Sequence, residues 1–184
     1  MPWPTRPAAT AAIRTTSNLT MATSRFVPCT APMATTEQLG QSADMTDTGS
    51  VRYAREPGLD VGAFRRVLDE SGLGAIRPLD DALRLQQMLD QADLVVTARR
   101  SGDGDLLGVA RSITDFSWCC YLSELAVSKS AQGLGIGRGL LAETRRLVGP
   151  TVSVILGAVP QSVGFYEKIG MPRMPDAFWY RREH

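Results

Sequence analysis

Hydrophobic positions recur with the spacing of regular structure from about residue 51 onward. A short strand is predicted over residues 51–55, followed by helices over residues 61–71 and 81–91. Asp60 is placed to cap the first of these helices. The apolar positions that share a helix face are Val61, Phe64, Val67 and Leu68 in the first helix and Ala82, Leu85 and Leu89 in the second.

Three strand-like runs occupy the middle of the chain. Residues 93–100 and 106–114 are joined by residues 101–105, which are rich in turn formers and predict a hairpin. A third run, residues 118–128, follows directly. Residues 72–78, between the two helices, are irregular and long enough to line the mouth of a substrate site.

The C-terminal part of the chain continues to alternate between helix and strand. A helical pattern carries Ile136, Leu140 and Leu147 on one side and ends at Gly149-Pro150. A β-branched strand is predicted over residues 151–158, and a helix over residues 162–169. A last strand is predicted over residues 177–181. This order of elements predicts an α/β (α+β) domain with a mixed, mostly antiparallel sheet.

Residues 1–48 form a different kind of segment. They are rich in Ala, Thr, Ser and Pro and contain no acidic residue before Glu37, which predicts a disordered N-terminal extension and leaves residues 49–184 as the folded domain. Arginines without acids also resemble an organellar transit peptide, although prolines interrupt any amphipathic helix. A translation start at Met45 is a further alternative. We expect a cytoplasmic protein, with an organellar location as the alternative.

Charge and composition restrict the classes of partner. The net charge of +1 arises in the first 44 residues, because seventeen basic and seventeen acidic residues balance from Met45 onward. No run approaches the roughly 18 apolar residues of a membrane span. We therefore expect neither a nucleic acid nor a membrane as partner.

Histidine chemistry is excluded from any internal site. The one histidine is the last residue, His184, so acid–base work falls to carboxylates, tyrosines or cysteines. Cys29 lies in the polar N-terminal segment, and Cys119 and Cys120 are neighbours whose side chains point to opposite faces of a strand. Neither a disulfide framework nor a metal site is expected.

The richest motif is the glycine run between residues 132 and 139. Glycine occupies every second position from Gly133 to Gly139, after a strand and at the start of a helix. Bare backbone amides at a helix N-terminus favour an anion such as a phosphate. The spacing fits neither a dinucleotide fingerprint nor a P-loop, because Arg138 and Leu140 stand where those motifs need other residues.

The run resembles motif A of the GNAT acyltransferase superfamily, a Gln/Arg-x-x-Gly-x-Gly/Ala segment that holds the pyrophosphate of acetyl-coenzyme A. A second stretch, residues 163–171, resembles the helix that carries the Phe-Tyr-x-Lys-x-Gly-Phe signature of this family. The resemblance implies a GNAT-type sheet flanked by helices over about residues 51–182, with acetyl-coenzyme A as co-substrate. It implies pyrophosphate contacts from Gln132, Gly133, Leu134, Gly135, Ile136, Gly137 and Arg138.

The resemblance also implies roles for backbone and side chains beside this loop. Leu125, Ala126 and Val127 lie where the family offers main-chain groups to the pantetheine arm and the acyl carbonyl, with the Val127 N–H as oxyanion donor. Val159 replaces an Asn that commonly contacts the arm, which is a departure from the family pattern. Tyr166 lies at the position of the common general acid; packing beside Phe165 is its structural alternative.

A base for the incoming amine is harder to assign. Glu124 is the one carboxylate in the strand run 118–128, so it is the candidate base; facing solvent or pairing with an arginine are the alternatives. Asp115 is a weaker candidate for holding the amine. An aromatic group near the start of this strand favours an apolar or aromatic acceptor, or simply packs on the sheet. Its members are Phe116, Trp118 and Tyr121.

These residues predict an N-acetyltransferase that moves an acetyl group from acetyl-coenzyme A to a primary amine by direct attack in a ternary complex. A catalytically silent acyl-coenzyme A-binding regulatory module is the alternative. A ping-pong route through Cys119 or Cys120 is disfavoured, since no histidine is available to activate either thiol. The acceptor is open between a small-molecule amine and a protein amine, and a homodimer is the background expectation for assembly.

Overall fold

The computed structural model describes residues 50–183. The predictions for residues 1–48 and for His184 lie outside the described residues. The elements are β1 (Val51–Arg55), α1 (Val61–Glu70), η1 (Leu73–Ile76), α2 (Ala82–Asp90), β2 (Leu94–Arg100), β3 (Leu106–Thr114), β4 (Cys119–Val127), η2 (Lys129–Ala131), α3 (Ile136–Val148), β5 (Ser153–Ile155), η3 (Pro160–Ser162) and α4 (Val163–Lys168), where η marks a 3-10 helix.

Five strands form one sheet in the order β1-β2-β3-β4-β5. The first four strands pair antiparallel with their neighbours in sequence. Short connections join β2 to β3 and β3 to β4, whereas α1, η1 and α2 lie between β1 and β2. The last strand, β5, follows the helix α3 and pairs parallel with β4, as a crossover connection requires. The predicted mixed, mostly antiparallel sheet is therefore confirmed.

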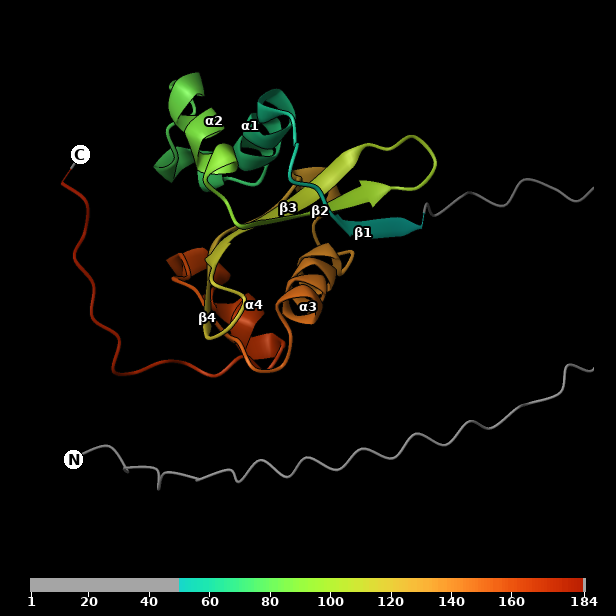
Figure 1. The fold of residues 1–184 in the computed structure, drawn as a ribbon. Helices are drawn as coiled ribbons and strands as arrows, with labels where there is room; N and C mark the ends of the chain where they lie inside the picture. Colours follow the sequence, from blue (N-terminus) through green and yellow to red (C-terminus); the bar gives the residue numbers. More distant parts are fainter. Residues whose placement is uncertain (1–49, 184) are drawn as a thin grey trace, which may run out of the picture. The chain divides into compact units, whose positions relative to one another are not determined.

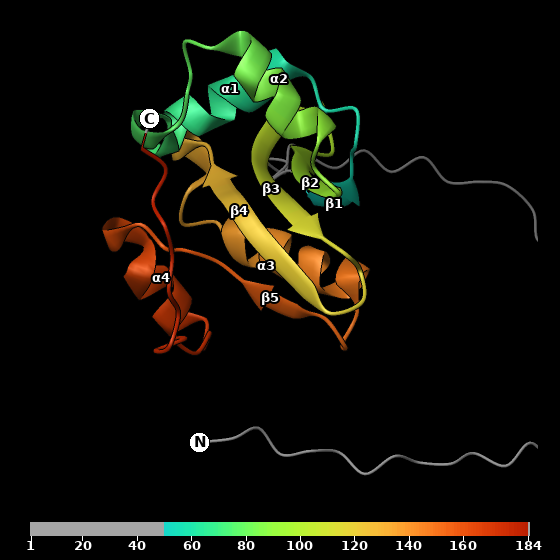
Figure 2. The same ribbon diagram turned by 60° about the vertical axis from the view of Figure 1, so that its left-hand side comes forward.

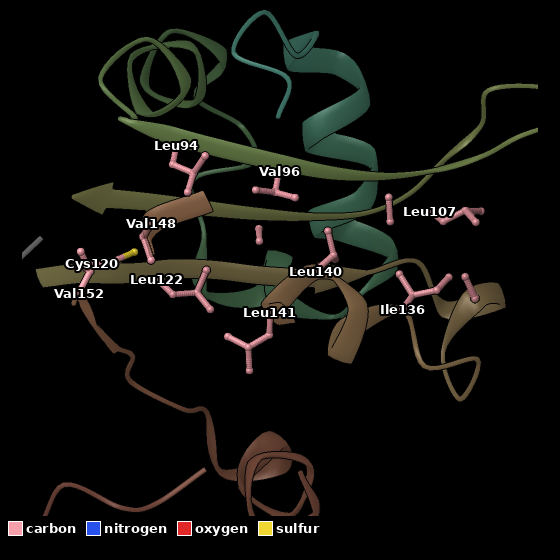
Figure 3. Packing of buried hydrophobic residues seen from close by; sticks show 13 residues of the cluster. Leu94, Val96, Leu107, Cys120, Leu122, Ile136, Leu140, Leu141, Val148 and Val152 are labelled. Atoms are coloured by element: carbon pink, nitrogen blue, oxygen red, sulfur yellow. The ribbon is translucent and has the colours of Figure 1, made fainter. Parts of the chain in front are cut away.

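Helices cover both faces of this sheet. Figure 1 shows α1 and α2 on one face and α3 on the other, with α4 beyond the β4 side. Two hydrophobic cores result. On the α3 face, Ile136, Leu140 and Leu141 pack against Leu94, Val96 and Leu122 of the strands (Figure 3). On the opposite face, Phe64, Val67 and Leu85 pack against Val95, Val109 and Ala126.

The local sequence explains where the covering helices begin. The Asp60 carboxylate accepts a hydrogen bond from the Ala63 N–H at 2.8 Å and so satisfies a free amide at the start of α1. Asp81 does the same for the Arg84 N–H at the start of α2, at 2.9 Å. In α3, Leu140 lies opposite Gly108, where an added Cβ would come within 3.0 Å of the leucine side chain. The helix therefore packs closely on β3.

Two predictions for the C-terminal part need correction. The strand predicted over residues 151–158 is only Ser153–Ile155, because its pairing with β4 covers three residues. Residues 177–181 form no strand in the structure. The side chains of Phe178, Trp179 and Tyr180 are largely exposed there, and three consecutive aromatic residues lack the alternation that lets a strand bury one face.

Within residues 50–183, no helix is both long and apolar enough to cross a bilayer. The same part of the chain contains no group of three or more His, Cys, Asp or Glu side chains that could hold a metal ion.

Candidate acyl-coenzyme A and amine site

The site is organised by the divergence of β4 from β5. The two strands pair only through Cys119, Cys120 and Tyr121, opposite Ser153 to Ile155. Figure 2 shows the strands close together where β4 begins and apart toward its arrowhead. The later part of β4, from Leu122 to Val127, thus has an open edge with unpaired backbone groups. Such an edge can offer main-chain hydrogen bonds to an extended ligand.

The glycine loop follows directly after this open edge. Gly133 and Gly135 adopt left-handed φ angles of 83° and 79°, and Gly135 is the N-cap residue of α3. These values favour glycine, because a side chain at positive φ is strained. The Gln132 side chain donates to the carbonyl oxygen of Val127 at 3.1 Å, which closes the loop against the end of β4.

The backbone amides at the start of α3 are free for a ligand. In the described part of the chain, the first amide of this region to donate a backbone hydrogen bond is that of Gly139, to the Gly135 carbonyl at 3.0 Å. The preceding amides, from Gly133 to Arg138, donate none. An added Cβ at Gly133 or Gly135 would meet nothing within 4 Å, so the space above the loop is open. This arrangement fits a pyrophosphate, which needs several amide donors at a helix N-terminus.

The two sequence motifs meet in space. The Phe165 ring of α4 lies 3.3 Å from the position of a Cβ on Gly137, in the first turn of α3. The same Gly137 position is 3.8 Å from the Val127 side chain at the end of β4. A side chain larger than hydrogen at Gly137 would press on this ring. The third glycine of the loop therefore allows α4 to approach the phosphate cradle.

Tyr166 lies next to this contact. Its ring meets that of Phe165 edge to face, with centroids 5.0 Å apart. Burial raises the pKa of Tyr166 above its ordinary value of 10.0. Tyr166 also lines a cavity of about 350 Å³ between β5, α4 and the following residues, with Ile155, Leu156 and Met171 among its other walls. The phenol is thus protonated at neutral pH and borders a pocket that opens to the surface.

A β-bulge in β4 decides where Glu124 points. Arg111 of β3 pairs with Glu124 while Ser112 pairs with Leu122, so Ser123 is an extra residue on β4. Without the bulge, Leu122 and Glu124 would share one face of the strand. With it, Leu122 joins the core on the α3 face, whereas Glu124 lies on the face covered by α1 and α2.

Two arginines enclose the Glu124 carboxylate, whose residue is only 2% exposed. Arg77, just after η1, donates through Nε to Oε1 at 2.8 Å. Arg111 donates through Nε to Oε2. The Ser123 hydroxyl donates to Oε1 at 3.0 Å. Of the alternatives for Glu124, the structure contains the pairing with arginine, and its role as general base stays a prediction.

Neither Arg77 nor Arg111 was identified as a site residue by the sequence analysis. A signal for a cationic partner was nevertheless present, because a carboxylate in the middle of a strand that also contributes to a core must be paired when buried. The pattern did not show which of the many arginines would supply the pair. Arg77 and Glu124 are 47 residues apart in the sequence.

The remaining candidates lie nearer the beginning of β4. The Asp115 carboxylate accepts hydrogen bonds from the backbone amides of Ser117, Trp118 and Cys119, and these bonds lower the pKa of Asp115. Its Oδ1 thus organises the β3–β4 turn. Tyr121 is half exposed at the point where β4 and β5 separate. Cys119 is exposed and Cys120 is buried, as expected for neighbours in a strand.

Comparison with known proteins agrees with this geometry. The family described as "Acetyltransferase (GNAT) domain" matches residues 75–178, which include β4, the glycine loop and α4. The chain belongs to the GNAT acetyltransferase family.

Individual relatives carry the same assignment. Serotonin N-acetyltransferase 2, chloroplastic, of Oryza sativa subsp. japonica is 33% identical over 124 residues, 65% of this chain. The chain spans only 60% of that relative's length. The uncharacterized N-acetyltransferase ycf52 of Pyropia yezoensis is 30% identical over 78% of this chain and 85% of its own. A GNAT family acetyltransferase structure from Streptococcus pneumoniae TIGR4 superposes with a TM-score of 0.54 at 20% identity, over 73% of this chain and all of that chain.

Proposed function

We propose that the protein transfers an acetyl group from acetyl-coenzyme A to a primary amine by direct attack within a ternary complex. The observation that carries the proposal is the row of unpaired amides from Gly133 to Arg138 beside the open edge of β4. These amides suit the pyrophosphate, and the β4 edge suits the extended pantetheine arm. Backbone groups of Leu125, Ala126 and Val127 bind the arm in this proposal.

Three groups of this chain act on the reacting atoms in the proposed mechanism. The Val127 N–H donates to the acyl oxygen as negative charge develops there. The amine nitrogen forms a bond to the acyl carbon while the bond from carbon to sulfur breaks. The Tyr166 hydroxyl gives its proton to the departing thiolate, which its raised pKa allows because the phenol stays protonated at neutral pH. Glu124 is the proposed acceptor of the ammonium proton, directly or through water, and the proton that then leaves the attacking nitrogen returns to the Tyr166 oxygen and restores the phenol.

An aromatic amine is the proposed acceptor class. The name of the rice relative identifies serotonin as the acceptor of that protein. In this chain, Tyr121 is 49% exposed at the separation of β4 and β5, on the strand that carries Glu124. An exposed ring at this place can stack on the ring of an arylalkylamine.

The test combines binding with turnover. Calorimetry should detect coenzyme A binding to the intact protein, and a thiol-release assay should detect free coenzyme A with acetyl-coenzyme A and a panel of amines. The panel contains serotonin, an aliphatic diamine, an aminoglycoside and a lysine peptide. We expect the fastest release with serotonin. Binding without release for any amine would favour the silent acyl-coenzyme A-binding module instead, and no binding at all would refute both readings.

The choice between the two proposed cellular locations depends on residues 1–48 and not on the described domain. We propose a cytoplasmic protein, with the transit-peptide reading of residues 1–48 as the alternative. Fusion of residues 1–48 to a fluorescent protein separates the two, because import into an organelle requires only the extension.

A further inference from the structure

Hydrogen bonds from one side chain join the loop between α1 and α2 to the sheet, in addition to the packing of Leu73 and Leu79 on the core beneath α1 and α2. Within residues 50–183, all hydrogen bonds from residues 72–80 to a strand come from Arg77. Its Nε binds Glu124 Oε1 at 2.8 Å, and its Nη2 binds the Ser123 carbonyl at 3.0 Å. The two contacts from one planar guanidinium fix both position and direction.

Arg77 contacts β4 at its bulge, and we call this contact of Arg77 with Ser123 and Glu124 the anchor. Ser123 is the extra residue of this strand and Glu124 follows it, at the start of the open edge. On the strand, Glu124 is also held by a second arginine, Arg111. Arg111 binds Glu124 from β3 and also donates to the Met88 carbonyl of α2 at 2.9 Å. By contrast, Arg77 directly follows the short 3-10 helix η1, whose last residues Ala75 and Ile76 are exposed.

The side chains of Arg77, Arg111 and Glu124 together carry one net positive charge. Arg77 and Arg111 bring two positive charges to the single carboxylate of Glu124. Arg111 alone suffices to neutralise Glu124, and its side chain is the more buried of the two, at 8% exposure against 15% for Arg77. Loss of Arg77 therefore leaves no buried charge unpaired, whereas loss of Arg111 would disturb β3, β4 and α2 together.

We propose that Arg77 is a positioning residue that holds the α1–α2 loop, residues 72–80, against β4 and thereby shapes the acceptor side of the site. The proposal rests on the proposed function only for its kinetic consequence. Since the loop lies on the α1 and α2 face and the phosphate cradle lies at the start of α3, release of the loop changes the amine site and leaves the coenzyme A site intact.

The test compares Arg77→Ala and Arg77→Lys with the wild type. In Arg77→Ala, amide hydrogen exchange in residues 72–80 should speed up by about tenfold, because the loop loses its hydrogen bonds to the sheet. The KM for the amine should rise by about fivefold or more, while the KM for acetyl-coenzyme A stays within about twofold. Arg77→Lys should recover part of the amine KM, since one ammonium can reach Glu124 but cannot form the planar pair of contacts.

Arg146→Ala is the matched control, because Arg146 makes a comparable pair with Glu143 within α3 and its side chain is 67% exposed. It should change neither exchange in the loop nor either KM. Unchanged exchange of residues 72–80 in Arg77→Ala overturns the proposal, and so does an equal rise of both KM values. If the wild type releases no coenzyme A with any amine, the proposed function fails, while the exchange measurement still decides whether Arg77 holds the loop.

Discussion

Tyr166 illustrates how burial suits one side chain to its proposed role as general acid. Its pKa is raised by burial, so the phenol keeps its proton throughout the neutral range. We expect Tyr166→Phe to lower kcat by about 100-fold, the usual contribution of a positioned general acid. Because the pKa of the phenol lies above its ordinary value of 10.0, the wild type should show no loss of kcat from this group below about pH 9.

Calorimetry supplies the control for this variant. The ring still packs edge to face on Phe165, so the affinity for coenzyme A should be unchanged. Undiminished turnover in Tyr166→Phe would remove the tyrosine from the mechanism and leave packing as its role.

Glu124 illustrates the opposite case, in which a buried charge is satisfied by neighbours. Replacing it by Ala leaves Arg111 buried without its carboxylate, and truncation of a buried pair typically costs about 3–5 kcal/mol. We expect that loss in the free energy of unfolding, measured by urea denaturation. Glu143→Ala is the control, because its partner Arg146 is solvent-exposed and such pairs contribute at most about 1 kcal/mol. Equal losses in the two variants would show that Glu124 is not a buried anchor.

The loop and α3 form the proposed phosphate-binding element, and a comparison of two glycines tests this role. Gly135 and Gly149 stand at opposite ends of α3 with φ angles of 79° and 86°. Neither would meet another atom within 4 Å if it gained a Cβ. Alanine should cost roughly 1 kcal/mol of stability at Gly135, whose ψ of 1° lies in the left-handed region, and more at Gly149, whose ψ of 170° is open almost only to glycine. Gly135 is the N-cap of α3, so Gly135→Ala changes the direction of the free amides there, whereas Gly149 lies at the other end of the helix. Only Gly135→Ala should therefore weaken coenzyme A binding, by about tenfold.

Calorimetry with coenzyme A and thermal denaturation of both variants provide the two measurements. Equal coenzyme A affinity in both variants would contradict the assignment of the cradle.

The elements differ in how far the sequence could predict them. The cradle was predictable because Gly133 and Gly135 are required by backbone geometry, and α1 because its apolar spacing and Asp60 cap are local signals. The bulge at Ser123 could not be predicted, because the alternation of apolar and polar residues alone does not show that a strand contains one extra residue. The missed bulge also hid the face of Glu124 and hence its pairing with Arg77.

Residues 177–181 show a second limit of prediction from local sequence, since a strand was predicted there and the structure has none. Their aromatic composition favours a strand, but a strand needs a partner for its backbone groups. The neighbouring β5 is only three residues long, and its register is set by β4. The high strand propensity of residues 177–181 therefore led to a wrong prediction, because a strand also needs a partner strand.

At the scale of the whole domain, residues 49–184, sixteen acidic and seventeen basic residues nearly balance, so the response to pH depends on particular pairs. Glu56 is one of them. It accepts hydrogen bonds from Arg99 and Thr97 of β2, and the Arg99 bonds hold the pKa of Glu56 below its ordinary value of 4.5. A lowered pKa in the folded state means that unfolding takes up a proton as the solution becomes acidic. The stability that Glu56 contributes is thus present above about pH 4.5 and is lost as the pH falls through its folded pKa.

Glu56→Gln should therefore reduce the free energy of unfolding near pH 7 and make little difference near pH 3. Urea denaturation across this range measures the difference between variant and wild type at each pH. Asp80→Asn serves as control, because the Asp80 side chain is fully exposed and only reaches Arg65 at 4.0 Å. Its difference from the wild type should be small at every pH. A Glu56→Gln difference that stays constant from pH 7 to pH 3 would mean that Glu56 stabilises the first two strands through packing rather than through its charge.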